Sequence, residues 1–261
     1  MNRHILFFDI DGTILSEVTH VISADTKAAI EAARKNGHLA FINTGRTLEE
    51  LDDRILSLDF DGLVCGCGTY ILHEKEVLLN QKLTKEVMDS VLSDLKKCNL
   101  EACLEGVNKV YFDKDSTNDT ICSLRASMKA RNFQLGTFDD SDIDFTKFTI
   151  WVQDTSDYSS FYESQKKNFT FIDRGNSFFE IVPHGYSKAT GIQFLLDHFN
   201  LSIDDAYAFG DSTNDLSMLT YVPHSIAMGN SDPSLFPLVS FVTKDVDDNG
   251  ISYALKHFNL I

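Results

Sequence analysis

Two short segments place aspartates directly after apolar runs. The first is Asp9-Ile10-Asp11-Gly12-Thr13, which follows the apolar run 5–8. Residues i and i+2 of an extended chain point to the same side, so Asp9 and Asp11 can face one reacting centre. Two carboxylates in different environments can divide the work of a nucleophile and a general acid. A strand-ending aspartate followed by an Asp-Gly turn explains the same letters, and this segment alone leaves both interpretations open.

The second segment is Gly210-Asp211-Ser212-Thr213-Asn214-Asp215, which follows the apolar run 206–209. Mg²⁺ takes oxygen ligands and is typically held by one or two carboxylates together with a substrate phosphate. Ser212 and Asp215 also have the spacing of a capping box. A helix cap and a metal site can share a helix start, so the two interpretations are compatible.

Two further polar residues stand at comparable places. Thr44 follows the apolar run 39–43, and its hydroxyl would lie beside a helix N-terminus, where anions are favoured. Lys188 opens an amphipathic segment and could neutralise phosphate charge. Taken singly, Thr44 is better explained by a strand-to-helix turn, and Lys188 by a solvated surface lysine.

The elements that must position these residues alternate between strands and helices. Apolar runs predict strands at 3–9, 39–43 and 206–209, and Ser23 predicts the start of a helix that runs through Asn36. Capping boxes predict helices after Thr47 and after Ser212. This βα alternation is typical of a parallel sheet, in which ligands bind at the carboxyl ends of the strands.

Between Leu83 and Pro183 the pattern changes to that of an α+β domain. We expect helices at 84–98, 119–131 and 157–167, and strands at 100–104, 108–112, 148–153, 169–173 and 177–182. The predicted fold is α/β: a Rossmann-like parallel-sheet core domain formed by residues 1–82 and 184–261, with an inserted α+β cap domain at residues 83–183. The four aspartates of Phe138–Asp144 are expected to form a solvated acidic loop, because the glycine and final glutamate of a calcium loop are missing.

Composition narrows the function. The 261 residues are 43% hydrophobic and 24% charged, as in globular proteins, and 23 basic against 39 acidic side chains give a formal net charge of −16. Such a chain is a poor candidate for binding nucleic acid or an anionic membrane, and it would hold an anion only through a local positive site or a cation. No run of 18 apolar residues is present, and five cysteines in a chain of this size indicate reduced thiols and a cytoplasmic location.

Considered together, the four elements resemble those of haloacid dehalogenase-like (HAD) hydrolases, specifically the Cof-type phosphatase branch with a type IIB cap. Asp9–Thr13 resembles motif I, Thr44 motif II, Lys188 motif III and Gly210–Asp215 motif IV. The C-terminal segments Ala227–Asn230 and Asp248–Ile251 also resemble signatures of the branch. One position departs from the pattern: Cys67 stands where the branch commonly has asparagine, and a thiol cannot replace an amide that both donates and accepts.

The resemblance implies a Mg²⁺-dependent phosphoric monoester hydrolase that acts on small phosphorylated metabolites of the sugar-phosphate type through an aspartyl-phosphate. Asp9 would be the nucleophile and Asp11 the general acid and base, while Thr44 and Lys188 would hold phosphate oxygens. The implied metal ligands are the side chains of Asp9 and Asp211 and the backbone carbonyl of Asp11. Asp215 would orient metal-bound water. The implied phosphate contacts are Ile10, Gly12, Thr44, Gly45, Arg46, Lys188 and Asn214.

Two alternatives remain at this point. A phosphotransferase or sugar-phosphate mutase would use the same Asp9 and Asp11, although a cap inserted at 83–183 favours a phosphatase. A non-catalytic sensor would only bind a phosphorylated ligand, and no catalytic position is substituted in that direction. Hinges are expected near Leu83 and at Pro183–Gly185, and Arg174 and Asn176 are the candidate specificity residues of the cap, in a segment that a plain hairpin turn also explains.

Overall fold

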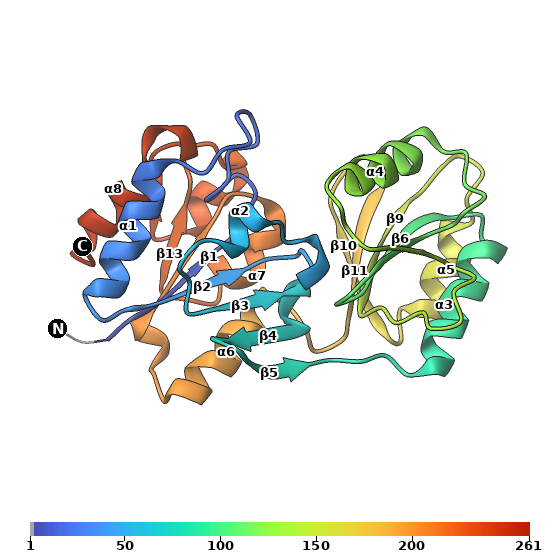
Figure 1. Ribbon diagram of the computed structural model, residues 1–261, viewed down its shortest axis with the longest axis horizontal. Helices are drawn as coiled ribbons and strands as arrows, with labels where there is room; N and C mark the ends of the chain where they lie inside the picture. Colours follow the sequence, from blue (N-terminus) through green and yellow to red (C-terminus); the bar gives the residue numbers. More distant parts are fainter. Residues whose placement is uncertain (1–2) are drawn as a thin grey trace. The chain divides into compact units, whose positions relative to one another are not determined.

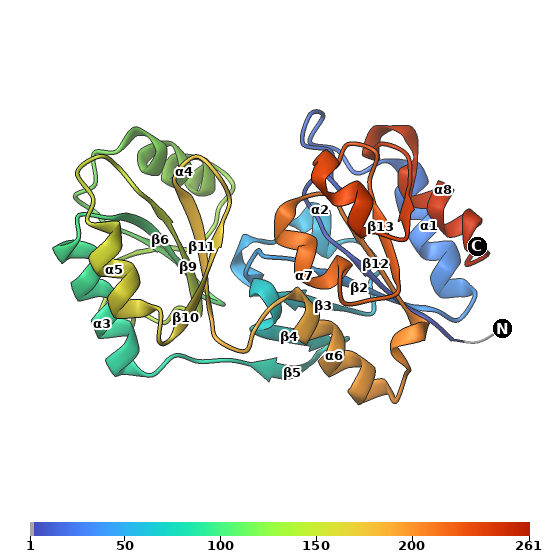
Figure 2. The ribbon, with the colours of Figure 1, turned by 180° about the vertical axis from the view of Figure 1, so that it is seen from behind.

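The computed structural model describes residues 3–261, which form two compact units (Figures 1 and 2). The core unit holds the described residues up to Gly45, together with Asp53–Leu79 and Tyr186–Ile261. The inserted unit holds Asn80–Gly185 and, in addition, the short segment Arg46–Asp52. The expectation had placed this segment in the core domain. It groups with the inserted unit because, among other contacts, the Glu49 carboxylate accepts a hydrogen bond from the backbone N–H of Gln134.

The core unit is built on one eight-stranded sheet in the order β14-β13-β12-β1-β2-β3-β4-β5. Neighbours from β14 through β3 run parallel, and β4 returns antiparallel to β3. The strands are β1 (Ile5–Phe8), β2 (Leu39–Asn43), β3 (Gly62–Cys65), β4 (Tyr70–His73), β5 (Glu76–Asn80), β12 (Ala206–Gly210), β13 (His224–Ala227) and β14 (Phe241–Val242).

Strand register decides where the polar residues of the motifs lie. Phe8 of β1 pairs with Ile42 of β2 on one side and with Phe209 of β12 on the other. The next residues along these parallel strands therefore meet at one level of the carboxyl edge of the sheet. These residues are Asp9, Asn43 and Gly210.

Helices cover both faces of this sheet, which explains why its central strands are apolar throughout rather than alternating. On one face Phe7 and Phe41 pack against Ile192, Leu195 and Met218 from two of the helices. Two others, α1 and α8, lie side by side (Figures 1 and 2). The helices are α1 (Ala24–Lys35), α2 (Asp53–Leu56), α6 (Lys188–Phe199), α7 (Leu216–Leu219) and α8 (Gly250–His257).

Local capping signals have mixed outcomes. Ser23 accepts a hydrogen bond from the N–H of Thr26 and starts α1 as predicted. The capping box at Thr47 forms, but it opens only a 3₁₀ turn, because the chain becomes extended at Leu51. The box at Ser212 likewise opens a 3₁₀ turn before the four-residue helix α7. The 3₁₀ turns are η1 (Leu48–Glu50), η2 (Gly66–Gly68), η3 (Ile203–Asp205), η4 (Thr213–Asp215), η5 (Pro233–Leu238) and η6 (Val246–Asp248).

The inserted unit has a six-stranded sheet in the order β10-β11-β9-β6-β7-β8, which is antiparallel except between β7 and β8. Its strands are β6 (Glu101–Glu105), β7 (Val110–Phe112), β8 (Leu135–Thr137), β9 (Lys147–Trp151), β10 (Phe169–Asp173) and β11 (Phe178–Pro183). Its helices are α3 (Lys85–Lys97), α4 (Asp119–Ala130) and α5 (Tyr158–Gln165). The strand β8 was not predicted; the other elements lie within a few residues of their expected bounds.

Alternation along β6 divides the two faces of this sheet. Leu104 packs with Phe148 in a cluster that also holds residues of α3 and α5, while Cys103 packs with Ile121 and Met128 of α4. Figure 1 accordingly shows α3 and α5 on one side of the sheet and α4 on the other.

The proposed specificity residues Arg174 and Asn176 lie in the turn between β10 and β11. Asn176 adopts a left-handed backbone conformation, with φ 51°, which asparagine tolerates in turns. The Arg174 guanidinium donates to Glu180 Oε2 at 3.2 Å, within the inserted unit. Both residues therefore have a structural explanation in the hairpin.

A buried ionic cluster ties three strands of the inserted unit together. The Lys147 ammonium contacts Glu105 and lies 2.9 Å from Glu180 Oε1, and all three side chains are almost completely buried. Burial raises the pKa of Glu105 to about 8; Lys147 opposes this shift, and the carboxylates of Glu50 and Glu180 add to it.

Glu105 should make the stability of the protein fall as pH rises. Its pKa is about 8 in the folded protein against an ordinary value of 4.5, so between these values unfolding releases a proton. The free energy of unfolding then falls with pH by up to about 1.4 kcal/mol per unit from this group. We predict that Glu105→Gln flattens the dependence, as measured by urea unfolding across this interval. Parallel curves for the two proteins would contradict the assignment.

Candidate active site

The Asp9–Thr13 segment turns sharply at the end of β1. The Ile10 carbonyl accepts hydrogen bonds from the N–H groups of Thr13, Ile14 and Leu15, which closes a compact loop. Gly12 has φ +73°, and a Cβ atom there would lie 2.3 Å from Asp211 Oδ2. Two features therefore require glycine at position 12: the positive φ of the backbone and the close approach of the Asp211 carboxylate.

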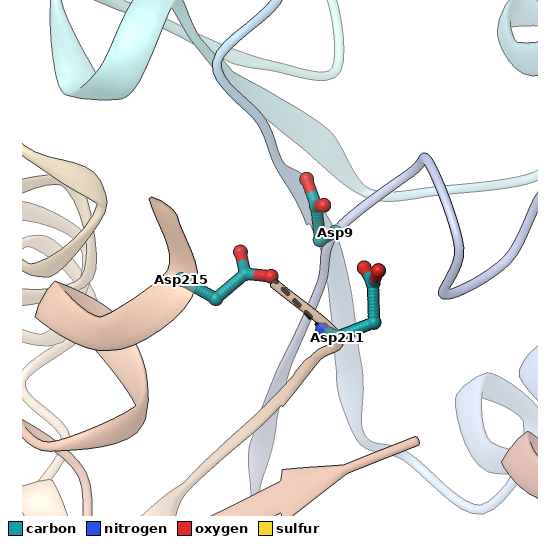
Figure 3. A group of neighbouring side chains, drawn as sticks. All are labelled: Asp9, Asp211 and Asp215. Carbon is teal, nitrogen blue, oxygen red and sulfur yellow. Dashed lines mark hydrogen bonds between the residues drawn. The ribbon is translucent and has the colours of Figure 1, made fainter. Parts of the chain in front are cut away.

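Three aspartates meet at this edge of the sheet. Asp9, Asp211 and Asp215 are buried, and one carboxylate oxygen from each lies within 4.8 Å of the others (Figure 3). The structure thus brings together the ends of β1 and β12, as the motifs predicted. The Asp11 side chain is half-buried and does not belong to this group. The resemblance implied a metal contact only for its backbone carbonyl.

Lys188 is buried at the first position of α6 and is not the solvated lysine that its sequence position alone allows. Its ammonium donates to Asp9 Oδ1 at 2.7 Å and to Asp215 Oδ1 at 2.6 Å. Burial opposes the positive charge, but the carboxylates of Asp215 and Asp9 outweigh it, so the pKa of Lys188 lies above its usual value. The ammonium therefore stays charged and joins the two motifs.

Asp215 is held by protein donors on both oxygens. Oδ1 accepts from Lys188, while Oδ2 accepts from the N–H groups of Asp211 at 2.9 Å and Ser212 at 3.1 Å. The dashed line in Figure 3 marks the bond to Asp211. A Cβ atom on Gly210 would lie 2.6 Å from the Asp215 carboxyl carbon, so a side chain there would displace it. Through these hydrogen bonds, Asp215 orients the Lys188 ammonium and the backbone of Asp211 and Ser212.

The cluster carries three carboxylates against one ammonium. Burial raises the pKa of Asp9 to about 7; Asp215 adds to the shift, and Lys188 opposes it. Burial, followed by the charges of Asp9 and Asp215, raises the pKa of Asp211 to about 8. A hard divalent cation prefers such oxygen donors and would compensate their excess negative charge. The donor set therefore fits a divalent metal.

Thr44 reaches the same sheet edge from β2. It is buried, its N–H donates to the carbonyl of Val64, and its carbonyl accepts from the N–H of Cys67. Cys67 has φ 54° and lies in the turn η2. The turn at the atypical Cys67 therefore supports Thr44 through its backbone.

The remaining predicted phosphate contacts are distributed differently. Gly45 is the last residue of its stretch of the core unit, and Arg46 belongs to the inserted unit, where its guanidinium donates to the carbonyl of Glu50. In the core unit, Asn214 Oδ1 accepts a hydrogen bond from the hydroxyl of Ser212. These hydrogen bonds of Arg46 and Asn214 are thus local, because each joins the residue to a neighbour within four positions in the sequence.

Three residues to which the sequence analysis assigned no role also organise the site, although two of them, Thr13 and Asn230, lie within the motifs that it quoted. The Thr13 hydroxyl donates to Asp211 Oδ1 at 3.1 Å. The Asn230 amide donates to the carbonyl of Gly12 at 2.8 Å and accepts from the N–H of Val246. Asn43 donates to the carbonyl of Lys188 at 3.0 Å. The available signal was a polar residue at or beside the end of an apolar run.

The chain belongs to the haloacid dehalogenase-like hydrolase family, which matches residues 6–255. The family and the fold predicted from the sequence are therefore confirmed, as is the class of enzyme, a HAD-like hydrolase. Among residues 3–261, no helix has both the length and the apolar composition needed to cross a bilayer.

Several characterised or solved proteins are similar to this chain along nearly their whole length. The chain is 28% identical to 5-amino-6-(5-phospho-D-ribitylamino)uracil phosphatase YwtE of Bacillus subtilis (strain 168), covering 94% of each chain. It is 25% identical to an HMP-PP phosphatase of Yersinia pseudotuberculosis serotype I (strain IP32953), covering 96% of this chain and 93% of the relative. The structure of BT4131, a sugar phosphatase of HAD subclass IIB, aligns with a TM-score of 0.84 at 25% identity, covering 99% and 100% of the chains.

The contact between Gly12 and Asp211 leads to a test of the metal site. Gly12→Ala should push Asp211 away and weaken divalent-cation binding by about 10–100-fold, as losses around metal ligands typically do. Isothermal titration calorimetry with MgCl₂ measures the change. Gly37→Ala is the matched control, because Gly37 also has a positive φ (+94°) but no neighbour within 4 Å of its added Cβ. Equal cation affinity in the two variants would contradict the proposed role of this contact.

Proposed function

We propose that this protein is a Mg²⁺-dependent phosphatase that hydrolyses small phosphorylated metabolites of the sugar-phosphate type through an aspartyl-phosphate on Asp9. One observation carries the proposal: the buried Asp9 carboxylate lies beside Asp211 and shares the Lys188 ammonium with Asp215. Family membership supports it, since two relatives named as phosphatases of particular compounds and a structure named as a sugar phosphatase are similar over almost the whole chain.

In the proposed first step, a carboxylate oxygen of Asp9 forms a bond to phosphorus while the bond from phosphorus to the leaving oxygen breaks. Asp11 gives its proton to that oxygen, so the product leaves as an alcohol. A positioned general acid of this kind is typically worth about 10²–10⁴-fold in rate. The ion pair with Lys188 keeps the carboxylate of Asp9 in place.

In the second step, Asp11 takes a proton from water, and the water oxygen attacks the phosphorus of the aspartyl-phosphate. The bond between phosphorus and Asp9 breaks, which releases inorganic phosphate and restores both carboxyl groups. Thr44, Lys188 and the backbone N–H groups of the motif I loop would hold the phosphate oxygens as charge moves among them.

Mg²⁺, held by Asp9, Asp211 and the backbone carbonyl of Asp11, would supply positive charge that neutralises the phosphoryl group and the nucleophile. Asp215 would orient this assembly through the N–H groups that it accepts from. The negative charge of the chain is compatible with an anionic substrate because the ammonium and the cation act locally.

Asp9→Asn tests the covalent step. The amide keeps the shape of the side chain but cannot attack phosphorus, so turnover should fall at least about 10³-fold while the protein stays folded. Phosphate release from a panel of phosphorylated metabolites with Mg²⁺ measures the change, and circular dichroism monitors folding. Asp89→Asn, on the exposed face of α3, is the control for loss of one negative charge. Nearly unchanged turnover in Asp9→Asn would rule out the covalent mechanism.

Removal of the metal tests the cofactor. Exhaustive chelation should abolish phosphate release, and added MgCl₂ should restore it. Asp211→Asn should raise the MgCl₂ concentration needed for half-maximal activity, because carboxylates dominate hard-cation sites. Analysis of products in the presence of a sugar acceptor separates hydrolysis from phosphoryl transfer. Full activity after chelation would contradict a metal-dependent reaction.

A further inference from the structure

Asn43 is a buried amide at the junction of the motifs. It is the last residue of β2, has no solvent exposure and directly precedes Thr44. Phe41 and Val64, on β2 and the neighbouring strand β3, belong to the apolar cluster beneath this edge of the sheet. The mechanism proposed above gives this amide no part.

The two ends of the amide have different environments. Nδ2 donates to the carbonyl of Lys188 at 3.0 Å and lies 3.6 Å from the sulfur of Met218. Oδ1 is buried and has no hydrogen-bond partner among the described residues. Burying an unpaired amide oxygen lowers stability, so packing alone does not account for asparagine at this position.

The backbone that Asn43 holds is the start of α6, which also lies close to β3 and η2. A Cβ atom on Gly191 would lie 2.4 Å from Val64 Cγ1, and one on Gly68 would lie 2.4 Å from the carbonyl oxygen of Ser187. These close approaches fix the first turn of α6 against β3 and η2. The hydrogen bond from Asn43 adds a polar tie from the end of β2.

We propose that Asn43 is a positioning residue that holds the backbone of Lys188 and thereby keeps its ammonium between Asp9 and Asp215; the inference rests on the proposed function. The ammonium lies 2.7 Å and 2.6 Å from these two carboxylates, at the end of a flexible four-carbon chain. Its place therefore depends on where that chain begins. A misplacement of about 1 Å in a reacting group can cost about 10²-fold in rate.

Asn43→Leu is the decisive variant, because leucine has a similar shape, removes the donor and eliminates the unpaired oxygen. We expect kcat for p-nitrophenyl phosphate to fall about tenfold or more, and the Ki of inorganic phosphate to rise, while the thermal midpoint stays equal or increases. A residue with a purely structural role would not combine retained stability with slower turnover. An unchanged kcat in a folded Asn43→Leu protein overturns the proposal. If this variant does not fold, Asn43→Ala takes its place with the same expected activities.

Ser225→Ala is the matched control. Ser225 is a buried polar residue of the same unit, and its hydroxyl accepts a hydrogen bond from the N–H of Ser240, away from Lys188. Its loss should lower stability and leave kcat unchanged. If Ser225→Ala slows turnover as much as Asn43→Leu does, the effect is general and the proposal fails.

A double variant shows whether Asn43 acts through Lys188. In a Lys188→Ala background, assayed at high enzyme concentration, Asn43→Leu should cause no further loss. Losses that multiply would mean that Asn43 acts by another route. If the wild-type protein releases no phosphate, the proposed function fails on its own, and calorimetric binding of inorganic phosphate still decides the inference: Asn43→Leu should bind more weakly than wild type and Ser225→Ala, and equal affinity overturns it.

Discussion

The ion pairs of the Lys188 ammonium are the interaction on which the buried site depends. They join Asp9, which follows β1, to Asp215, which follows β12, next to a third carboxylate on Asp211. Removing one partner of a buried ion pair leaves an uncompensated charge and typically costs about 3–5 kcal/mol. The chain as a whole carries a net charge of −16, so its long-range field disfavours anions. An anion at this edge would therefore depend on local positive charge, which the Lys188 ammonium supplies.

Space is the second constraint, because charges this close leave no room for extra side-chain atoms. Gly12 and Gly210 lie against the carboxylates of Asp211 and Asp215, and a Cβ atom at either position would overlap them. The strand register explains the crowding, since parallel pairing of β1 with β2 and β12 brings three chain segments to one level. The sheet determines which residues meet, and the glycines determine how closely they approach.

Much of the fold can be predicted from the sequence because apolar runs and helix caps are local signals. The strands β2 and β10 have their predicted bounds, and Ser23 caps α1. The capping boxes at Thr47 and Ser212 form but begin 3₁₀ turns, because a cap satisfies only the first N–H groups and continuation depends on packing. The strand β8 has only three half-buried residues at a sheet edge, so its sequence carries no periodic pattern.

The sequence allows one to predict which side chains of the candidate site meet, but not the contacts that hold them in place. The motifs occur in order at strand ends, and a parallel sheet brings such ends together, so Asp9, Asp211 and Lys188 could be named in advance. The burial of Lys188 could not be predicted, because its two carboxylate partners lie 179 and 27 residues away in the sequence. Asn43 is 145 residues from the carbonyl that it holds, so no local pattern indicates the contact. The motif residues form recognisable local segments. A residue that holds them is marked locally only by its polar type beside an apolar run, because the group that it contacts lies on a distant segment of the chain.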